Sequence, residues 1–138
     1  MHARFAAAIA VAGLITISCG GIVDPSQNKV ENFSGTIPPG GGGQSVQPFT
    51  AASGGELTVK ITALSPITQT YIGVAWAQAA SDGSCNAYGG VLFSTNFAQL
   101  NVPAISGANI VSGKYCIVVY DIGAFAAPEN YTISVSHP

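Results

Sequence analysis

An alternation of apolar and polar residues with a period of two constrains the fold of this chain more than any other feature. The alternation is clearest over residues 56–64, ELTVKITAL, where every second residue is apolar and the intervening ones are Glu, Thr and Lys. This period buries one face of a β-strand and leaves the other face in water. No segment after residue 23 shows the 3.6-residue period of an amphipathic helix. The pattern therefore predicts an all-β domain.

Similar runs recur along the chain between clusters of Gly, Pro, Asn and Ser. The expected strands cover residues 31–37, 44–50, 56–64, 71–77, 90–94, 98–102, 113–121 and 130–136. The run 113–121 is almost continuously apolar, as is typical of a central strand covered on both faces. Four consecutive glycines at 40–43 predict a loop, because glycine loses much entropy in a regular element. Seven or eight short strands at this spacing indicate a two-sheet antiparallel β-sandwich.

The first 18 residues are typical of a bacterial signal peptide, which is expected to be helical. Arg4 precedes an apolar run over residues 5–17, which has the length of a signal-peptide core and is short for a membrane-spanning helix. The following Ser18, Cys19 and Gly20 resemble the lipobox of bacterial lipoproteins, although Thr16 stands where Leu is usual. This resemblance implies that Cys19 carries a lipid with fatty acyl chains such as palmitate. It also favours the outer membrane or cell surface, because Gly20 is not the Asp that retains lipoproteins at the inner membrane.

Two other routes of processing stay open. Cleavage after Gly20 would release a soluble secreted protein, and an uncut segment 5–23 would serve as an anchor. The cysteine count favours the lipoprotein, because three cysteines are an awkward odd number for an exported protein. A lipid on Cys19 leaves Cys85 and Cys116 as one pair. We therefore expect residues 19–30 to form a lipidated tether and residues 31–138 to form the domain.

Cys85 and Cys116 are expected to form a structural disulfide. Their pairing would close a loop of about 30 residues, which stabilises a fold by about 3–4 kcal/mol on the chain-entropy estimate. A redox or metal-binding pair is less favoured, because the two cysteines lack a Cys-x-x-Cys spacing and a neighbouring histidine.

Several motifs together resemble a known family. They are F-x-G-T-I-P-P-G at 33–40, G-K-Y-C-I-V-V-Y-D-I-G at 113–123 and P-E-N-Y-T-I-S-V-S-H-P at 128–138. They resemble the bacterial pre-peptidase C-terminal (PPC-type) domains, especially the short stand-alone secreted versions, over nearly the whole chain after the leader. The resemblance implies a jelly-roll-like β-sandwich that is usually appended to secreted enzymes and is not itself catalytic. Because these 138 residues include no enzyme domain, a role in serving an attached peptidase does not carry over.

Candidate catalytic residues are few. After the leader the only histidine is His137, whose place beside the end of the chain is poor for a preorganised Ser-His-Asp site. Asp121 and Glu129 flank one loop and could approach each other as a glycosidase pair or, with Asn130 and loop carbonyls, as calcium ligands. Turn hydrogen bonds or solvation explain both carboxylates more simply. We expect no enzymatic activity, no cofactor and no bound metal.

Composition argues against nucleic acid as a partner. The chain after the leader has three lysines and six carboxylates, a formal net charge of −3, and no basic cluster to displace counterions.

Aromatic side chains suggest a different ligand, because their flat faces stack on sugar rings. Trp76 shares the apolar face of its expected strand and is assigned to the core, whereas Tyr88 and Phe125 lie in expected loops and are the candidate ligand-binding residues. The expected function is a non-catalytic structural or binding module of the cell envelope, whose partner is a surface glycan or an envelope protein. A carbohydrate-binding module is the alternative, and a small secreted hydrolase or peptidase accessory domain is a more distant one.

Overall fold

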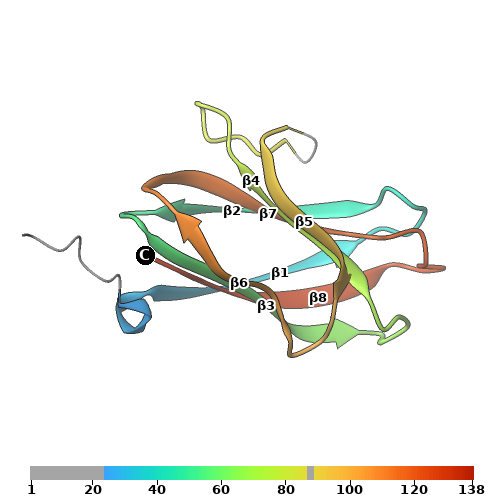
Figure 1. Cartoon of the computed structure of the whole chain (residues 1–138). Coiled ribbons are helices and arrows are strands. Elements are labelled where there is room, and N and C mark those ends of the chain that lie inside the picture. The colour runs from blue at the N-terminus through green and yellow to red at the C-terminus, as the bar shows by residue number, and fades with distance from the viewer. Residues whose placement is uncertain (1–23, 87–88) are drawn as a thin grey trace, which may run out of the picture.

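Eight strands build the structure, a computed structural model that describes residues 24–86 and 89–138 (Figure 1). The expected signal-peptide helix and Cys19 lie outside the described residues. A short 3₁₀ turn, η1 (Pro25–Gln27), precedes the first strand. The strands are β1 (Lys29–Ile37), β2 (Gln44–Ala51), β3 (Gly55–Ser65), β4 (Ile72–Gln78), β5 (Val91–Ala98), β6 (Pro103–Ile110), β7 (Gly113–Tyr120) and β8 (Glu129–His137).

The strands form two four-stranded sheets packed face to face. One sheet, here the β8 sheet, has the order β1-β8-β3-β6, and the other, the β7 sheet, has the order β2-β7-β4-β5. All paired strands are antiparallel. Every connection except β4–β5 passes from one sheet to the other, which is the arrangement of an eight-stranded jelly roll. The predicted all-β sandwich is therefore confirmed.

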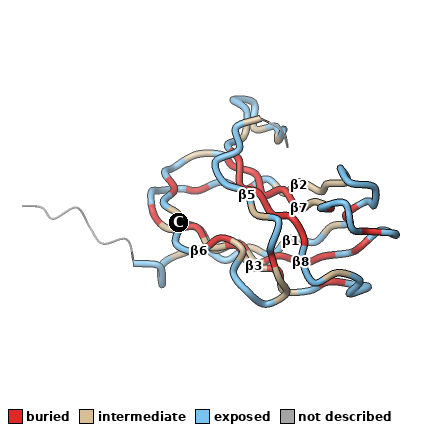
Figure 2. The backbone as a smooth tube through the Cα atoms, turned by 45° about the vertical axis from the view of Figure 1, so that its right-hand side comes forward, coloured by how far each residue is buried: buried red, intermediate tan, exposed pale blue. Residues whose placement is uncertain are grey.

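The core lies between the sheets and follows the period-two pattern (Figure 2). In β3, Leu57, Val59 and Ile61 are fully buried, and the residues between them are partly exposed. Residues 115–119 of β7 are all buried, as predicted for a strand covered on both faces. Trp76 is also in the core, with 8% of its surface exposed and its ring centroid 5.9 Å from that of Tyr115.

The expected strand at 98–102 is wrong. Residues 99–102 connect the two sheets, and Asn101 has a left-handed backbone (φ 63°) while its N–H donates to the carbonyl of Ile61 at 2.8 Å. The true strand, β6, was missed because it reads as a turn. It begins with Pro103, which an edge strand tolerates at its first position, and it contains Gly107 with a positive φ of 63°.

The first strand begins two residues earlier than expected, at Lys29. The residue before it is also attached to the domain, because the side-chain amide of Asn28 donates to the carbonyl of Glu56 at 2.8 Å and to Oγ of Ser136 at 3.2 Å. Part of the expected tether is thus held against the sandwich.

Candidate functional site

The outer face of the β7 sheet, which points away from the core, carries small side chains next to one tyrosine. Because Tyr115, Ile117 and Val119 face the core, Cys116, Val118 and Tyr120 lie on the outer face. Cross-strand pairing continues this face onto β4 and β5. Val118 lies opposite Ala75, Ala75 opposite Ser94, and Tyr120 opposite Gly73.

Part of this outer face lines a groove of about 380 Å³, which we call the outer groove. Its floor and sides come from all four strands of the sheet: Gln44 of β2, Val118 and Tyr120 of β7, Ala75 of β4, and Ser94 and Asn96 of β5. Gly41, Gly42 and Ile122 from two loops line one end. The volume falls within the range of pockets that bind small ligands.

The ring of Tyr120 is fixed in place within the groove. It lies against Gly73, where an added Cβ would come within 2.1 Å of the ring. Its hydroxyl donates to Oδ1 of Asn96 at 2.7 Å. Burial raises the pKa of the Tyr120 phenol above its ordinary value, so this hydroxyl keeps its proton at neutral pH. Glycine at position 73 is therefore what allows the ring to lie on the sheet.

Asp121 joins the two loops at one end of the groove. Its Oδ2 accepts hydrogen bonds from the N–H groups of Gly40 and Gly41 at 3.0 Å each, and its Oδ1 accepts from those of residues 123–125 at 2.8–3.1 Å. Burial acts to raise the pKa of this carboxyl, but the backbone hydrogen bonds outweigh burial and hold the pKa below its ordinary value. Turn hydrogen bonds, the simpler explanation expected for Asp121, are confirmed. We call this cluster the Asp121 junction.

The glycine-rich loop adopts a conformation that requires glycine. Gly40 and Gly41 have φ angles of 112° and 65°. A Cβ on Gly43 would lie 1.7 Å from the carbonyl oxygen of Pro38. The N–H of Asp121 donates to the carbonyl of Gly43 at 2.8 Å. The predicted loop at 40–43 is thus confirmed, and it forms a defined wall of the groove.

The predicted disulfide between Cys85 and Cys116 is confirmed, with a Cα–Cα distance of 5.8 Å. Because Cys116 points to the outer face, the bond holds the β4–β5 loop on that face. Backbone hydrogen bonds from Gln78 to Gly90 (2.9 Å) and from Ala79 to Lys114 (3.0 Å) attach the base of the same loop. Figure 1 shows this loop standing above the β7 sheet, away from the β8 sheet. It leaves β4 at the strand end opposite the Asp121 junction, because Gln78 pairs with Tyr115 and Gly73 with Tyr120.

Two aromatic residues, Tyr88 and Phe125, are predicted from the sequence to bind ligand. Tyr88 lies outside the described residues. The expected exposure of Phe125 is wrong, because its side chain is only 6% exposed and belongs to the core. Its N–H donates to Asp121 at 3.1 Å, and this turn directs the apolar ring into the end of the sandwich.

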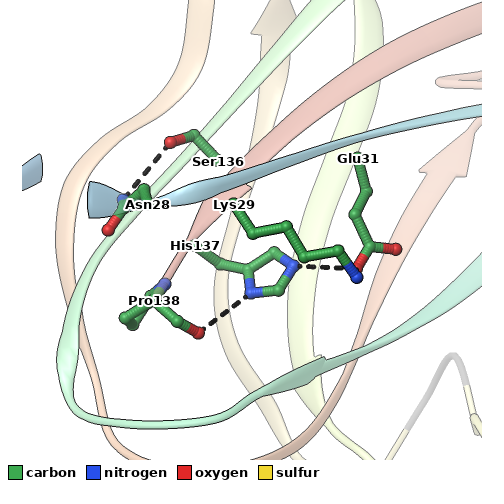
Figure 3. Close-up of polar contacts among 6 residues, drawn as sticks. All are labelled: Asn28, Lys29, Glu31, Ser136, His137 and Pro138. Carbon is green, nitrogen blue, oxygen red and sulfur yellow. Dashed lines mark hydrogen bonds and ion pairs between the residues drawn. The ribbon is translucent and has the colours of Figure 1, made fainter. Parts of the chain in front are cut away.

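His137 lies at the end of β8 in a cluster with Glu31 and Lys29 (Figure 3). The imidazole is 1% exposed, and its centroid is 5.0 Å from that of the Phe49 ring. Its Nε2 is 3.3 Å from Oε1 of Glu31, and its Nδ1 is 3.2 Å from the carbonyl oxygen of Pro138. The hydrogen bond from Lys29, aided by the one from His137, lowers the pKa of Glu31 against the opposing effect of burial. Both imidazole nitrogens are engaged in contacts within the fold.

Glu129 is the second buried carboxylate. It is fully buried, and its Oε2 accepts a hydrogen bond from Oγ1 of Thr68 at 2.7 Å. Its Oε1 has no hydrogen-bond partner among the described residues. Asp121 and Glu129 thus have separate partners. Residues 24–86 and 89–138 contain no group of three or more His, Cys, Asp or Glu side chains arranged to hold a metal ion.

Within the same part of the chain, no helix is long and apolar enough to cross a membrane.

Comparisons with known proteins do not name a family. No protein-family model and no curated protein matches the chain. Among solved structures, the chain is similar to one described as "Structure of infectious bursal disease virus Gt strain", with 15% identity and a TM-score of 0.26. The match covers 94% of this chain but only 36% of the viral one. A likeness at this level carries no functional argument, and the resemblance to PPC-type domains stays a prediction from sequence motifs.

Sequence reasoning missed Gln44, Ser94, Asn96 and Tyr120 as groove residues. One signal was present for Tyr120, which follows Cys116 and Val118 at period two and so belongs to the face opposite the core-facing residues. The small Gly73 and Ala75 are a second signal, because small residues on a strand leave room above it. Ser94 and Asn96 could not be found, because their place depends on the pairing of β5 with β4.

Proposed function

We propose that this chain is a non-catalytic binding module of the bacterial cell envelope, held at a membrane by a lipid on Cys19, and that its ligand occupies the outer groove. The observation that carries this proposal is the fixed shape of the groove. Five hydrogen bonds to Asp121 hold the two loops that line one end, and Gly73 and Asn96 hold the ring of Tyr120. A surface that is ordered before binding loses less entropy when the ligand arrives.

The contacts of the reactive side chains support a role without catalysis. His137 is packed against Phe49, and both its ring nitrogens lie within 3.3 Å of oxygen atoms of Glu31 and Pro138. The carboxylate of Asp121 is occupied by backbone N–H groups. A general base has to reach its substrate with a free lone pair, and these two groups are already committed to the fold.

The position of the first strand supports an N-terminal anchor that leaves the groove accessible. Asp24 is five positions after Cys19, so the extended chain from one to the other spans at most about 18 Å. The strand that follows, β1, belongs to the β8 sheet, whereas the groove opens on the outer face of the β7 sheet. An anchored domain would therefore sit close to the membrane with its groove on the sheet that does not contain β1.

Intact-mass analysis of the membrane form tests the anchor. We expect a chain that begins at Cys19 and carries the mass of a diacylglyceryl or triacyl group, and we expect Cys19→Ala to move the protein out of the membrane fraction. An unmodified chain that begins at Gly21 would contradict the proposed anchor.

Retention of envelope fragments tests the binding surface. Ser94 is exposed in the groove, so Ser94→Trp fills the groove without disturbing the core. Asn32→Trp is the matched control, because Asn32 is exposed on β1 in the other sheet. We expect immobilised wild type and Asn32→Trp to retain envelope material from the producing cells, and Ser94→Trp to retain at least tenfold less. Equal retention by all three proteins would exclude the groove as the binding surface.

A further inference from the structure

We propose that the outer groove binds a neutral polysaccharide chain. This inference rests on the proposed function and names the class of its ligand. Four properties of the groove lead to it: the absence of an available charge, the supply of neutral hydrogen-bonding groups, one fixed aromatic face, and a direction across the strands.

The groove offers no charge to a ligand. The sequence has no Asp, Glu, Lys, Arg or His between residues 83 and 113, so β5 and its flanking loops contribute none. Among the described residues, Asp121 is the one charged residue that lines the groove, and both its oxygens accept backbone hydrogen bonds. An ionic ligand would lose hydration here without gaining a counter-charge, which is unfavourable. The groove therefore selects a neutral ligand.

The polar groups that line the groove suit hydroxyls. Among the described residues, the side chains of Gln44 and Ser94 have no hydrogen-bond partner, and Asn96 uses its Oδ1 for Tyr120. Amides and hydroxyls both donate and accept, and a sugar hydroxyl does the same. Bound sugar hydroxyls would satisfy groups that now face solvent.

Tyr120 supplies the aromatic face. One side of its ring lies on Gly73, and the ring lines the groove. The face of an aromatic ring is negative, so it attracts the weakly positive C–H groups on the flat side of a sugar ring. Its hydrogen bond to Asn96 keeps the ring in one orientation, so a sugar binds without first ordering it.

The shape of the groove suits a chain of sugars. Its lining comes from all four strands, and the two loops that line it lie at the same strand end. The groove therefore runs across the strands and reaches the edge strand β5. A chain of sugars can enter and leave the groove along this direction. An extended peptide would instead be expected to pair with the edge of β5.

Affinity electrophoresis and titration calorimetry of the purified full chain test this inference. The probe is envelope polysaccharide of the producing cells, separated by anion exchange into neutral and acidic fractions. Tyr120→Leu removes the ring face, Tyr120→Phe keeps it, and Tyr71→Leu is the matched control, because Tyr71 is an exposed tyrosine that contacts Phe97 outside the groove lining. Thermal melts verify that each variant is folded.

We expect the neutral fraction to bind wild type and Tyr71→Leu equally, Tyr120→Phe within about threefold, and Tyr120→Leu at least tenfold more weakly. Binding of the acidic fraction alone, no binding of either fraction, or equal binding by Tyr120→Leu would overturn the inference. If one of these outcomes is found but Ser94→Trp still reduces the retention of envelope fragments, the proposed function is supported and only the proposed ligand class is wrong. If Ser94→Trp does not reduce that retention either, both proposals are wrong.

Discussion

Two buried carboxylates stand at the two ends of the loop 121–129, and they are used in opposite ways. Asp121 accepts hydrogen bonds from five backbone N–H groups that belong to two loops. Glu129 accepts one hydrogen bond from Thr68, and its second oxygen has no partner in the described chain. Burial alone therefore does not indicate what a carboxylate contributes.

The difference lies in what each carboxylate organises. A buried charge is costly unless hydrogen bonds replace its hydration, and hydrogen bonds to a charged group are stronger than those between neutral groups. Asp121 has such bonds on both oxygens, and through them it positions the loop wall of the outer groove. Glu129 holds one hydroxyl on the loop before β4 and orders no backbone N–H group in the described chain. We infer that the first supports the binding surface and the second contributes little to stability.

The largest effect is expected from Asp121→Asn. Either orientation of the new amide turns an N–H group toward backbone N–H groups, those of 40–41 or those of 123–125, so part of the junction is left unpaired. We expect the free energy of unfolding to fall by about 3 kcal/mol in urea denaturation. Asp82→Asn is the control, because Asp82 makes similar turn bonds to Ser84 at the exposed surface, and its effect should be clearly smaller. Equal losses of unfolding free energy in Asp121→Asn and Asp82→Asn would contradict the stabilising role of the Asp121 junction.

A pH series of wild type and Asp121→Asn should give a smaller change in the free energy of unfolding, with a defined sign. The folded-state pKa of Asp121 is below its ordinary value, so ionisation of this group favours the folded state. Its stabilisation is fully present above the unfolded pKa of about 3.9 and is lost as the pH falls through the folded-state value. The stability difference between wild type and Asp121→Asn should be constant above about pH 5 and should shrink below about pH 4. A difference that grows on acidification would contradict this sign.

The smallest effect is expected from Glu129→Gln. Glutamine keeps the acceptor for Thr68 and removes a buried carboxylate that has one unpartnered oxygen. We expect the free energy of unfolding to rise by less than about 1 kcal/mol in the same denaturation assay. A decrease of more than about 1 kcal/mol would mean that Glu129 organises its surroundings as Asp121 does, and the contrast between them would disappear.

The sequence predicted the fold class and most strands because period-two alternation depends only on which face is buried. It predicted the disulfide because only one pairing remained once Cys19 was assigned to a lipid. It missed β6, where Pro103 and Gly107 resemble a turn, and it placed Phe125 outside because residues near it are typical of loops. The groove depends on strand order and on contacts between loops distant in sequence, such as Gly40 with Asp121, which local patterns do not contain.

Hydrogen exchange of the purified full chain, with and without envelope fragments, tests most directly whether the outer groove is the binding surface. We expect slower exchange of backbone amides at residues 40–44, 91–96 and 118–122, which lie along the groove, and no change in β1 or β6. Protection confined to the β8 sheet, or no protection at all, would contradict the account.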